Sequence, residues 1–69
     1  MQVTYAIQHP GMSMAALVDA DDRRLQGSLI AQVSMRIMRE FDVALPFEEF
    51  RCVRVENPDE FVDLFGGER

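Results

Sequence analysis

The sequence holds a single cysteine, Cys52, so no disulfide can form within the chain. It has no apolar run as long as a membrane span and no basic start followed by an apolar stretch, so we expect neither a transmembrane helix nor a signal peptide. Internal repeats and low-complexity tracts are also missing. These absences favour a protein of the cytoplasm, where thiols stay reduced.

Basic residues are few, with seven against 12 acidic residues and a net charge of -5. Binding to nucleic acid or to an anionic membrane surface depends on positive charge, so we expect neither. The acidic balance permits a protein partner that carries a basic patch. Because the chain has 69 residues, we expect one small domain over residues 1–69, with a thin core and no deep cleft.

Residues that could perform chemistry are sparse. The only histidine, His9, lies beside Pro10 in a loop pattern, and no motif places it near Cys52. Cys52 is therefore expected to be a small apolar side chain and not a nucleophile. The acidic connection at residues 19–22 lacks the glycine-bearing form of a calcium loop. We predict no catalytic residue and no metal site, and hence a protein that is not an enzyme.

The first part of the chain predicts a strand and then a helix. The stretch "QVTYAI" at residues 2–7 alternates apolar and polar side chains, as a short strand does, although the pattern leaves open whether residues 1–12 are strand or disordered. Ser13 can cap a first helix, and Met14, Leu17 and Val18 have the spacing of its apolar stripe.

The most extended amphipathic pattern predicts a helix over residues 28–41. Its apolar side chains fill roughly two-thirds of the helix circumference, which is more than one core contact needs. The core side would hold Leu29, Val33, Ile37 and Phe41, and the outer side Ala31, Met35 and Met38. Exposed apolar surface usually marks an interface. We therefore predict a partner-binding or self-association site at Met35, Met38, Arg36 and Arg39.

The last third of the chain predicts two more short elements and a final helix. The stretch "PFEEF" is typical of one helical turn, and "RCVRVE" alternates like a strand. Asn57, Pro58 and Glu60 then form the start signal of a helix with a capping box. Its inward side would be Phe61, Leu64 and Phe65.

The segment "SLIAQVSMRIMREFDVALPFEEF" followed by "NPDEFVDLF" resembles acyl and peptidyl carrier proteins over residues 27–65. The resemblance implies an all-α fold, a small helical bundle in which Ser28 carries a 4'-phosphopantetheine arm. The arm would hold a thioester-linked intermediate for a polyketide, fatty-acid or nonribosomal peptide assembly system. The implied partners are a phosphopantetheinyl transferase and the assembly-line synthase enzymes, which supply the chemistry themselves.

Alternatives to this interpretation stay open. A serine after a glycine at the start of an apolar run commonly caps a helix, so Ser28 can be an N-cap. Counting back from Pro46 puts the family's serine position on Gly27, which favours a carrier-like domain without the arm that acts as a protein-binding or docking module. A third possibility is an α+β protein in which strands at 2–7 and 51–55 pair, acting as a homodimer or a protein-binding module.

Overall fold

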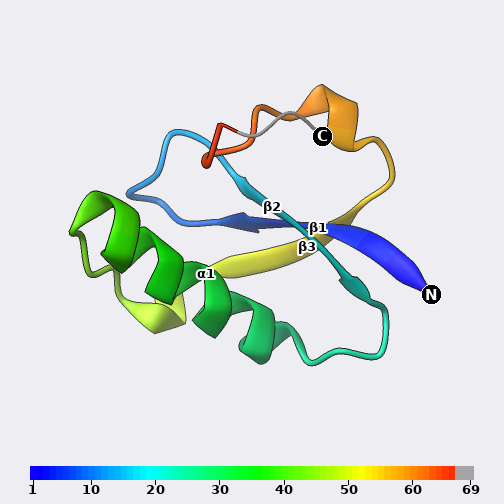
Figure 1. Ribbon diagram of the computed structural model, residues 1–69, viewed down its shortest axis with the longest axis horizontal. Coiled ribbons are helices and arrows are strands. Elements are labelled where there is room, and N and C mark those ends of the chain that lie inside the picture. Colours follow the sequence, from blue (N-terminus) through cyan, green and yellow to red (C-terminus); the bar gives the residue numbers. More distant parts are fainter. Residues whose placement is uncertain (67–69) are drawn as a thin grey trace.

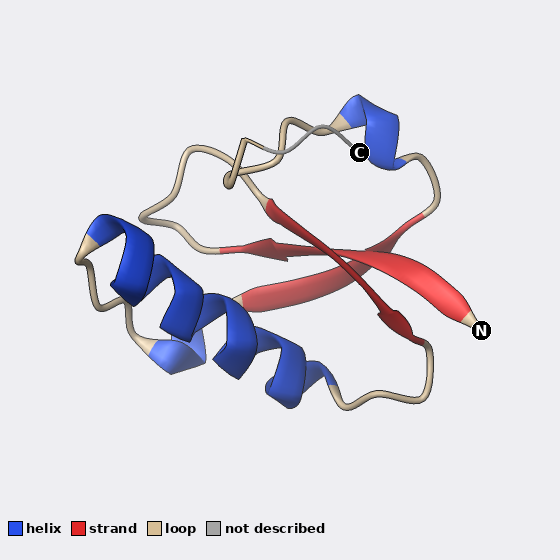
Figure 2. Ribbon diagram, viewed as in Figure 1, coloured by secondary structure: helices blue, strands red, loops and turns tan. Residues whose placement is uncertain are grey.

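The computed structural model describes residues 1–66 and has an α+β fold with one long helix on a three-stranded antiparallel sheet (Figures 1 and 2). The all-α bundle is therefore wrong, and the α+β alternative is the observed class. The sheet order is β2-β1-β3, which makes the first strand the middle one. Along the chain the elements are β1 (Gln2–Gln8), β2 (Ala16–Asp21), α1 (Gln26–Phe41), the 3-10 turn η1 (Phe47–Glu49), β3 (Arg51–Val55) and the 3-10 turn η2 (Pro58–Glu60).

Strand β1 confirms the strand expected at residues 2–7, and it pairs with β3 as the α+β alternative requires. The antiparallel register runs from Thr4 opposite Val55 to Gln8 opposite Arg51. The first helix predicted after Ser13 is wrong, because residues 16–21 form β2. In β2 the side chains alternate between the two faces of the sheet, and pairing with β1 satisfies main-chain groups that would otherwise be exposed along the second edge of β1.

Helix α1 covers one face of the sheet and makes the main core with it. Leu29, Val33 and Ile37 are buried and lie at the i, i+4, i+8 spacing of one helix face. Opposite them are Tyr5, Ile7, Ala16, Ala20 and Phe50. Phe41, which was expected in this core, is 48% exposed and instead stacks on Phe65 with ring centroids 6.2 Å apart.

The segment after β3 returns across the other face of the sheet, opposite α1 (Figure 1). The predicted last helix is wrong, because only Pro58–Glu60 form a turn and Asn57 makes no side-chain cap bond. The inward packing predicted for its apolar residues is nevertheless present. Phe61 packs on a small cluster of Ala6, Ala15 and Leu17, whereas Leu64 and Phe65 pack against the core under α1.

An extended segment suits this position better than a helix does. It passes along the edge of β2, where the Leu64 N–H donates to the Ala15 carbonyl over 2.8 Å and the Leu17 N–H donates to Asp63 Oδ1 over 3.3 Å. From this edge its side chains reach both faces of the sheet. A single helix would have directed its apolar side chains to one side only.

None of the helices within residues 1–66 has the length and apolar character needed to cross a membrane. Helix α1 is the longest, with 16 residues, and its outer side carries charged side chains.

Candidate functional site

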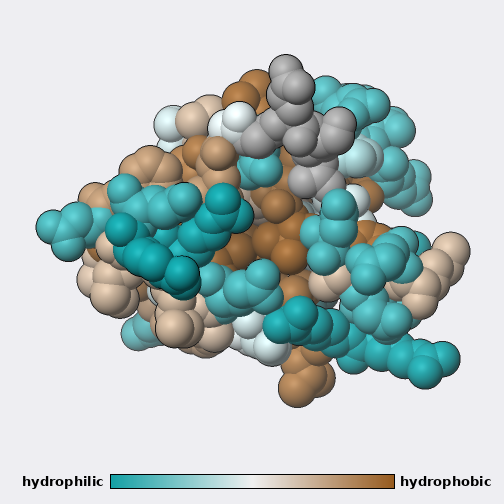
Figure 3. Space-filling model, viewed as in Figure 1, coloured by the Kyte–Doolittle hydropathy of each residue, from teal (hydrophilic) through white to brown (hydrophobic). Residues whose placement is uncertain are grey.

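The outer side of α1 presents a line of large apolar side chains, here called the α1 ridge: Met35, Met38 and Phe41. Their exposed fractions are 62%, 50% and 48%. Successive members are three residues apart, so they are neighbours along the helix surface. Figure 3 shows moderately hydrophobic surface over the C-terminal end of α1, interrupted by hydrophilic side chains. The exposure that the sequence predicted for Met35 and Met38 is observed, and Ala31 is half-buried beside them.

The ridge continues into a groove at the C-terminal end of α1. The groove has a volume of about 210 Å³ and lies between this end of the helix and the loop after β1. Phe41 and Val43 form part of its wall and are themselves about half exposed. The remaining wall is mostly apolar as well: Gly11, Met12, Ser13, Ile37, Leu45 and Leu64. The sequence analysis missed Phe41 as a surface residue because it fits the apolar periodicity of the helix, and it carried no prediction for Val43 in the loop after α1.

The two arginines predicted beside the ridge have different surroundings. Arg36 Nε donates to Glu40 Oε2 over 3.1 Å, and the Arg36 guanidinium carbon lies 3.9 Å from the centre of the Phe65 ring. This arginine therefore helps to hold Phe65 against the helix. Arg39 is exposed in the last turn of α1, where a positive charge is favoured by the helix dipole. Of the two, Arg39 is the one available to a partner.

Ser28 lies in the first turn of α1 and is not its cap. The N-cap is Leu25, with extended backbone angles and no side-chain cap bond, so the N-cap interpretation of Ser28 is wrong. The Ser28 N–H donates to the Leu25 carbonyl over 3.1 Å, and its side chain is exposed. The helical bundle implied by the carrier resemblance is replaced by strands before and after α1, so the surroundings of Ser28 do not fit that family. Attachment of phosphopantetheine there stays a prediction that these observations do not test.

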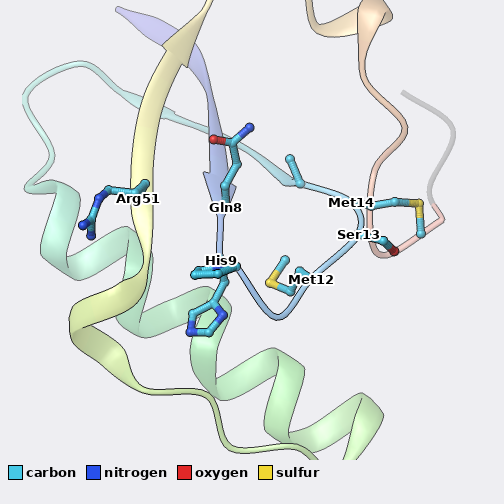
Figure 4. A pocket seen from close by; sticks show the side chains of 8 residues that line it. Gln8, His9, Met12, Ser13, Met14 and Arg51 are labelled. Carbon is cyan, nitrogen blue, oxygen red and sulfur yellow. The ribbon is translucent and has the colours of Figure 1, made fainter.

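His9 is the polar side chain most deeply placed, at 7% exposure, in the loop after β1. It lines a hollow of about 380 Å³ together with Gln8, Pro10, Met12, Ser13, Met14, Ala15 and Arg51. In Figure 4 the His9 ring points toward α1, whereas the Gln8 side chain points to the other face of the sheet. The ring meets Phe50 edge-on at a centroid distance of 4.8 Å. The sequence placed His9 correctly in a loop but carried no signal for its burial.

The bonding of His9 argues against a catalytic role. Its Nδ1 accepts the Gly11 N–H over 2.9 Å, so in the neutral ring the proton lies on Nε2. Nε2 has no hydrogen-bond partner and lies 3.6 Å from Glu49 Oε2. A general base needs a free lone pair facing its substrate, and here that lone pair is used to close the turn at Gly11. The arrangement is best explained as a support for the loop.

The Cys52 thiol and the carboxylates near the N-terminus also show no arrangement typical of a catalytic or metal site. Cys52 is partly buried, and this burial raises the pKa of its thiol, which keeps it in the unreactive protonated form. Asp21 Oδ2 and Asp22 Oδ1 lie 3.2 and 3.7 Å from the amino group of Met1. No group of three or more histidine, cysteine, aspartate or glutamate side chains within residues 1–66 could hold a metal ion.

Comparison with known proteins identifies no relative. No protein-family model, no curated protein and no solved structure matches this chain.

Proposed function

We propose that this protein is a non-catalytic interaction domain that binds another protein through the α1 ridge. The observation that supports this is the exposure of Met35, Met38 and Phe41 on one strip of a helix whose opposite side is buried. Small soluble domains seldom leave several large apolar side chains exposed side by side unless another molecule covers them. Methionine suits such a contact, because its flexible thioether adapts to the shape of the partner.

The ridge stands on a rigid support, which favours binding without rearrangement. Leu29, Val33 and Ile37 fix the helix to the sheet, so the ridge is already in place before a partner arrives. The groove beside Phe41 offers a place for one apolar side chain of the partner. Arg39 adds a positive charge next to this apolar strip. The partner surface we propose is therefore apolar and flanked by carboxylates.

A double variant, Met35→Gln with Met38→Gln, tests this function. Both side chains are at least half exposed, so the substitution should leave the thermal unfolding temperature nearly unchanged. A matched control is Gln26→Ala, which changes an exposed residue in the first turn of the same helix, nine residues before Met35. The parent, the control and the double variant would each be immobilised and incubated with a cell lysate. Proteins that bind to the parent and to the control, but not to the double variant, would be identified by mass spectrometry and purified.

The affinity of each purified partner is then measured by calorimetry. We expect the double variant to bind at least about 10-fold more weakly, since truncating apolar residues at the centre of an interface commonly costs more than 1 kcal/mol. Sedimentation of the parent alone shows whether the partner is a second copy. Equal affinity of the parent and the double variant, or a collapse of folding in the variant, would contradict the proposal.

A further inference from the structure

The two edge strands of the sheet, β2 and β3, differ in whether another segment of the chain covers them. At β2 the C-terminal segment occupies the edge, through the bond from the Leu64 N–H to the Ala15 carbonyl and through Asp63 Oδ1, which accepts the Leu17 N–H. At β3, the other edge, no strand within residues 1–66 pairs on the outer side. An uncovered edge strand presents unpaired main-chain groups that can bind another extended chain.

The pairing pattern identifies which groups of β3 point outward. The Leu17 N–H is taken by Asp63, so the Leu17 main chain points away from β1. Leu17 lies opposite Ala6, and alternation along an antiparallel pair then directs the Ala6 main chain to β3, where it faces Val53. The main-chain groups of the two flanking residues, Cys52 and Arg54, therefore point to the open side.

The side chains of β3 give this edge a charge opposite to that of the whole chain. Arg54 is exposed and makes no hydrogen bond or ion pair with residues 1–66. Arg51 Nη1 donates only to the main-chain carbonyls of Glu48 and Phe50, at 3.1 and 3.0 Å. Arg51 and Arg54 therefore have no carboxylate partner within residues 1–66. This is unusual in a chain whose net charge is -5. Val53 lies between the two arginines and is 44% exposed.

We propose that the outer edge of β3 binds an extended acidic peptide segment as a fourth strand of the sheet. Main-chain bonds to Cys52 and Arg54 would supply the general affinity, and the two arginines would select for acidic sequences. The same charges argue against a second copy of this chain as the occupant. Two β3 strands laid side by side would bring four arginines together, which disfavours self-pairing at this edge.

Strand geometry predicts the sequence pattern of the peptide. Arg51 and Arg54 are three positions apart, so their side chains lie on opposite faces of the sheet. An antiparallel peptide would place an acidic residue opposite Arg54, then an apolar residue opposite Val53, then any residue, then an acidic residue opposite Arg51. The predicted pattern is acidic, apolar, any, acidic, with a β-branched apolar residue preferred because it packs well in a sheet.

The first test uses a fluorescein-labelled peptide of about ten residues, the length of a long strand, with the core Glu-Val-Thr-Glu. Fluorescence anisotropy at low salt should show saturable binding that weakens as the salt concentration rises. Arg51→Glu and Arg54→Glu should each weaken binding about 10-fold or more, and Arg54→Lys should retain most of it. Arg23→Glu, an exposed arginine in the loop after β2, is the matched control and should bind like the parent, because β2 lies at the edge of the sheet opposite β3. Thermal unfolding confirms that each variant is folded.

The second test separates strand addition from simple charge attraction. Methylation of the peptide nitrogens at the first and third core positions, opposite Arg54 and Cys52, removes the amides that would face β3 and should abolish binding. Methylation at the second and fourth positions affects amides that point away and should leave binding intact. Absence of saturable binding by the parent peptide, or equal effects of the two methylation patterns, would overturn the proposal. Because the α1 ridge is a separate surface, Met35→Gln with Met38→Gln should leave peptide binding unchanged.

Discussion

At the scale of single residues, the start of α1 shows how a cap can be misplaced by sequence patterns. Ser28 had the residue type and the neighbours of an N-cap, yet the helix begins two residues earlier and Leu25 occupies the cap position. The residue at which a helix begins depends on the contacts that position the preceding loop. Here Arg24 Nη2 donates to Gln32 Oε1 over 3.1 Å, which ties that loop to the helix side. Local sequence carries no signal for such a contact.

The missing cap leads to a stability prediction. Leu25 is 77% exposed, and its side chain has no oxygen that could accept an N–H group of the first turn. Leu25→Asp should raise the free energy of unfolding by about 1 kcal/mol, because its carboxylate accepts one of these N–H groups and favours the helix dipole. Leu25→Ala separates capping from the removal of the leucine. Chemical denaturation measures both, and equal stability of the two variants would contradict the expectation.

The surroundings of Asp21 predict how the free energy of unfolding changes at acidic pH. Its Oδ1 accepts the Arg23 N–H over 2.8 Å, and this bond, followed by the one from the Met1 amino group, holds the pKa of Asp21 below its ordinary value of 3.8. A lowered pKa in the folded state means that the ionised form stabilises the fold. This contribution is complete above pH 3.8 and is lost as the pH falls through the lower folded value.

Asp21→Asn removes that contribution at every pH. Unfolding measured by denaturant over a pH series should therefore show a shallower loss of stability in acid for the variant than for the parent. Parallel curves for the two proteins would mean that Asp21 has the same pKa in the folded and unfolded states.

At the scale of elements, the C-terminal segment is an extended strap and not a helix, yet its apolar residues are needed. Phe61 covers Ala6 and Leu17 on the face opposite α1. Phe61→Ala should lower the free energy of unfolding by about 2 kcal/mol, less than for a fully buried phenylalanine because Phe61 is partly exposed. The control Val62→Ala changes a neighbour that is 71% exposed and should cost less than about 0.5 kcal/mol. Similar losses in both variants would refute the packing role assigned to Phe61.

The elements also show which patterns were informative. The strands at residues 2–7 and 51–55 and the helix ending at Phe41 were predictable from hydrophobic periodicity. The pairing of the two strands was predicted only as an alternative to the all-α bundle. Residues 14–18 were misassigned because Met14, Leu17 and Val18 satisfy helical spacing, while the strand signal of β2 is weakened by its alanines. Pairing with β1 stabilises the strand over the helix for these residues, and this pairing is a tertiary contact that the local sequence does not contain.

At the scale of the whole molecule, the carrier resemblance rested on one helix and the loop after it. That part of the chain is indeed a helix followed by a short turn at Phe47–Glu49. Many folds contain such a pair, so the match did not determine what surrounds it. The exposed Met35 and Met38 were predictable, because one sheet face cannot cover two-thirds of a helix. The open edge of β3 was not predictable, since it depends on strand order.

The placement of the first strand in the middle of the sheet has a consequence for synthesis. The β1–β2 hairpin is complete once Asp21 has been made, but the strand that covers the other side of β1 begins only at Arg51, 30 residues later (51 − 21). At about 5–20 residues per second, the ribosome leaves that side of β1 uncovered for a few seconds. During this interval the main-chain groups of β1 that later pair with β3 have no strand beside them. The growing polypeptide is therefore more exposed to mispairing than the folded domain, until synthesis of residues 51–55 supplies the strand that pairs with this side of β1.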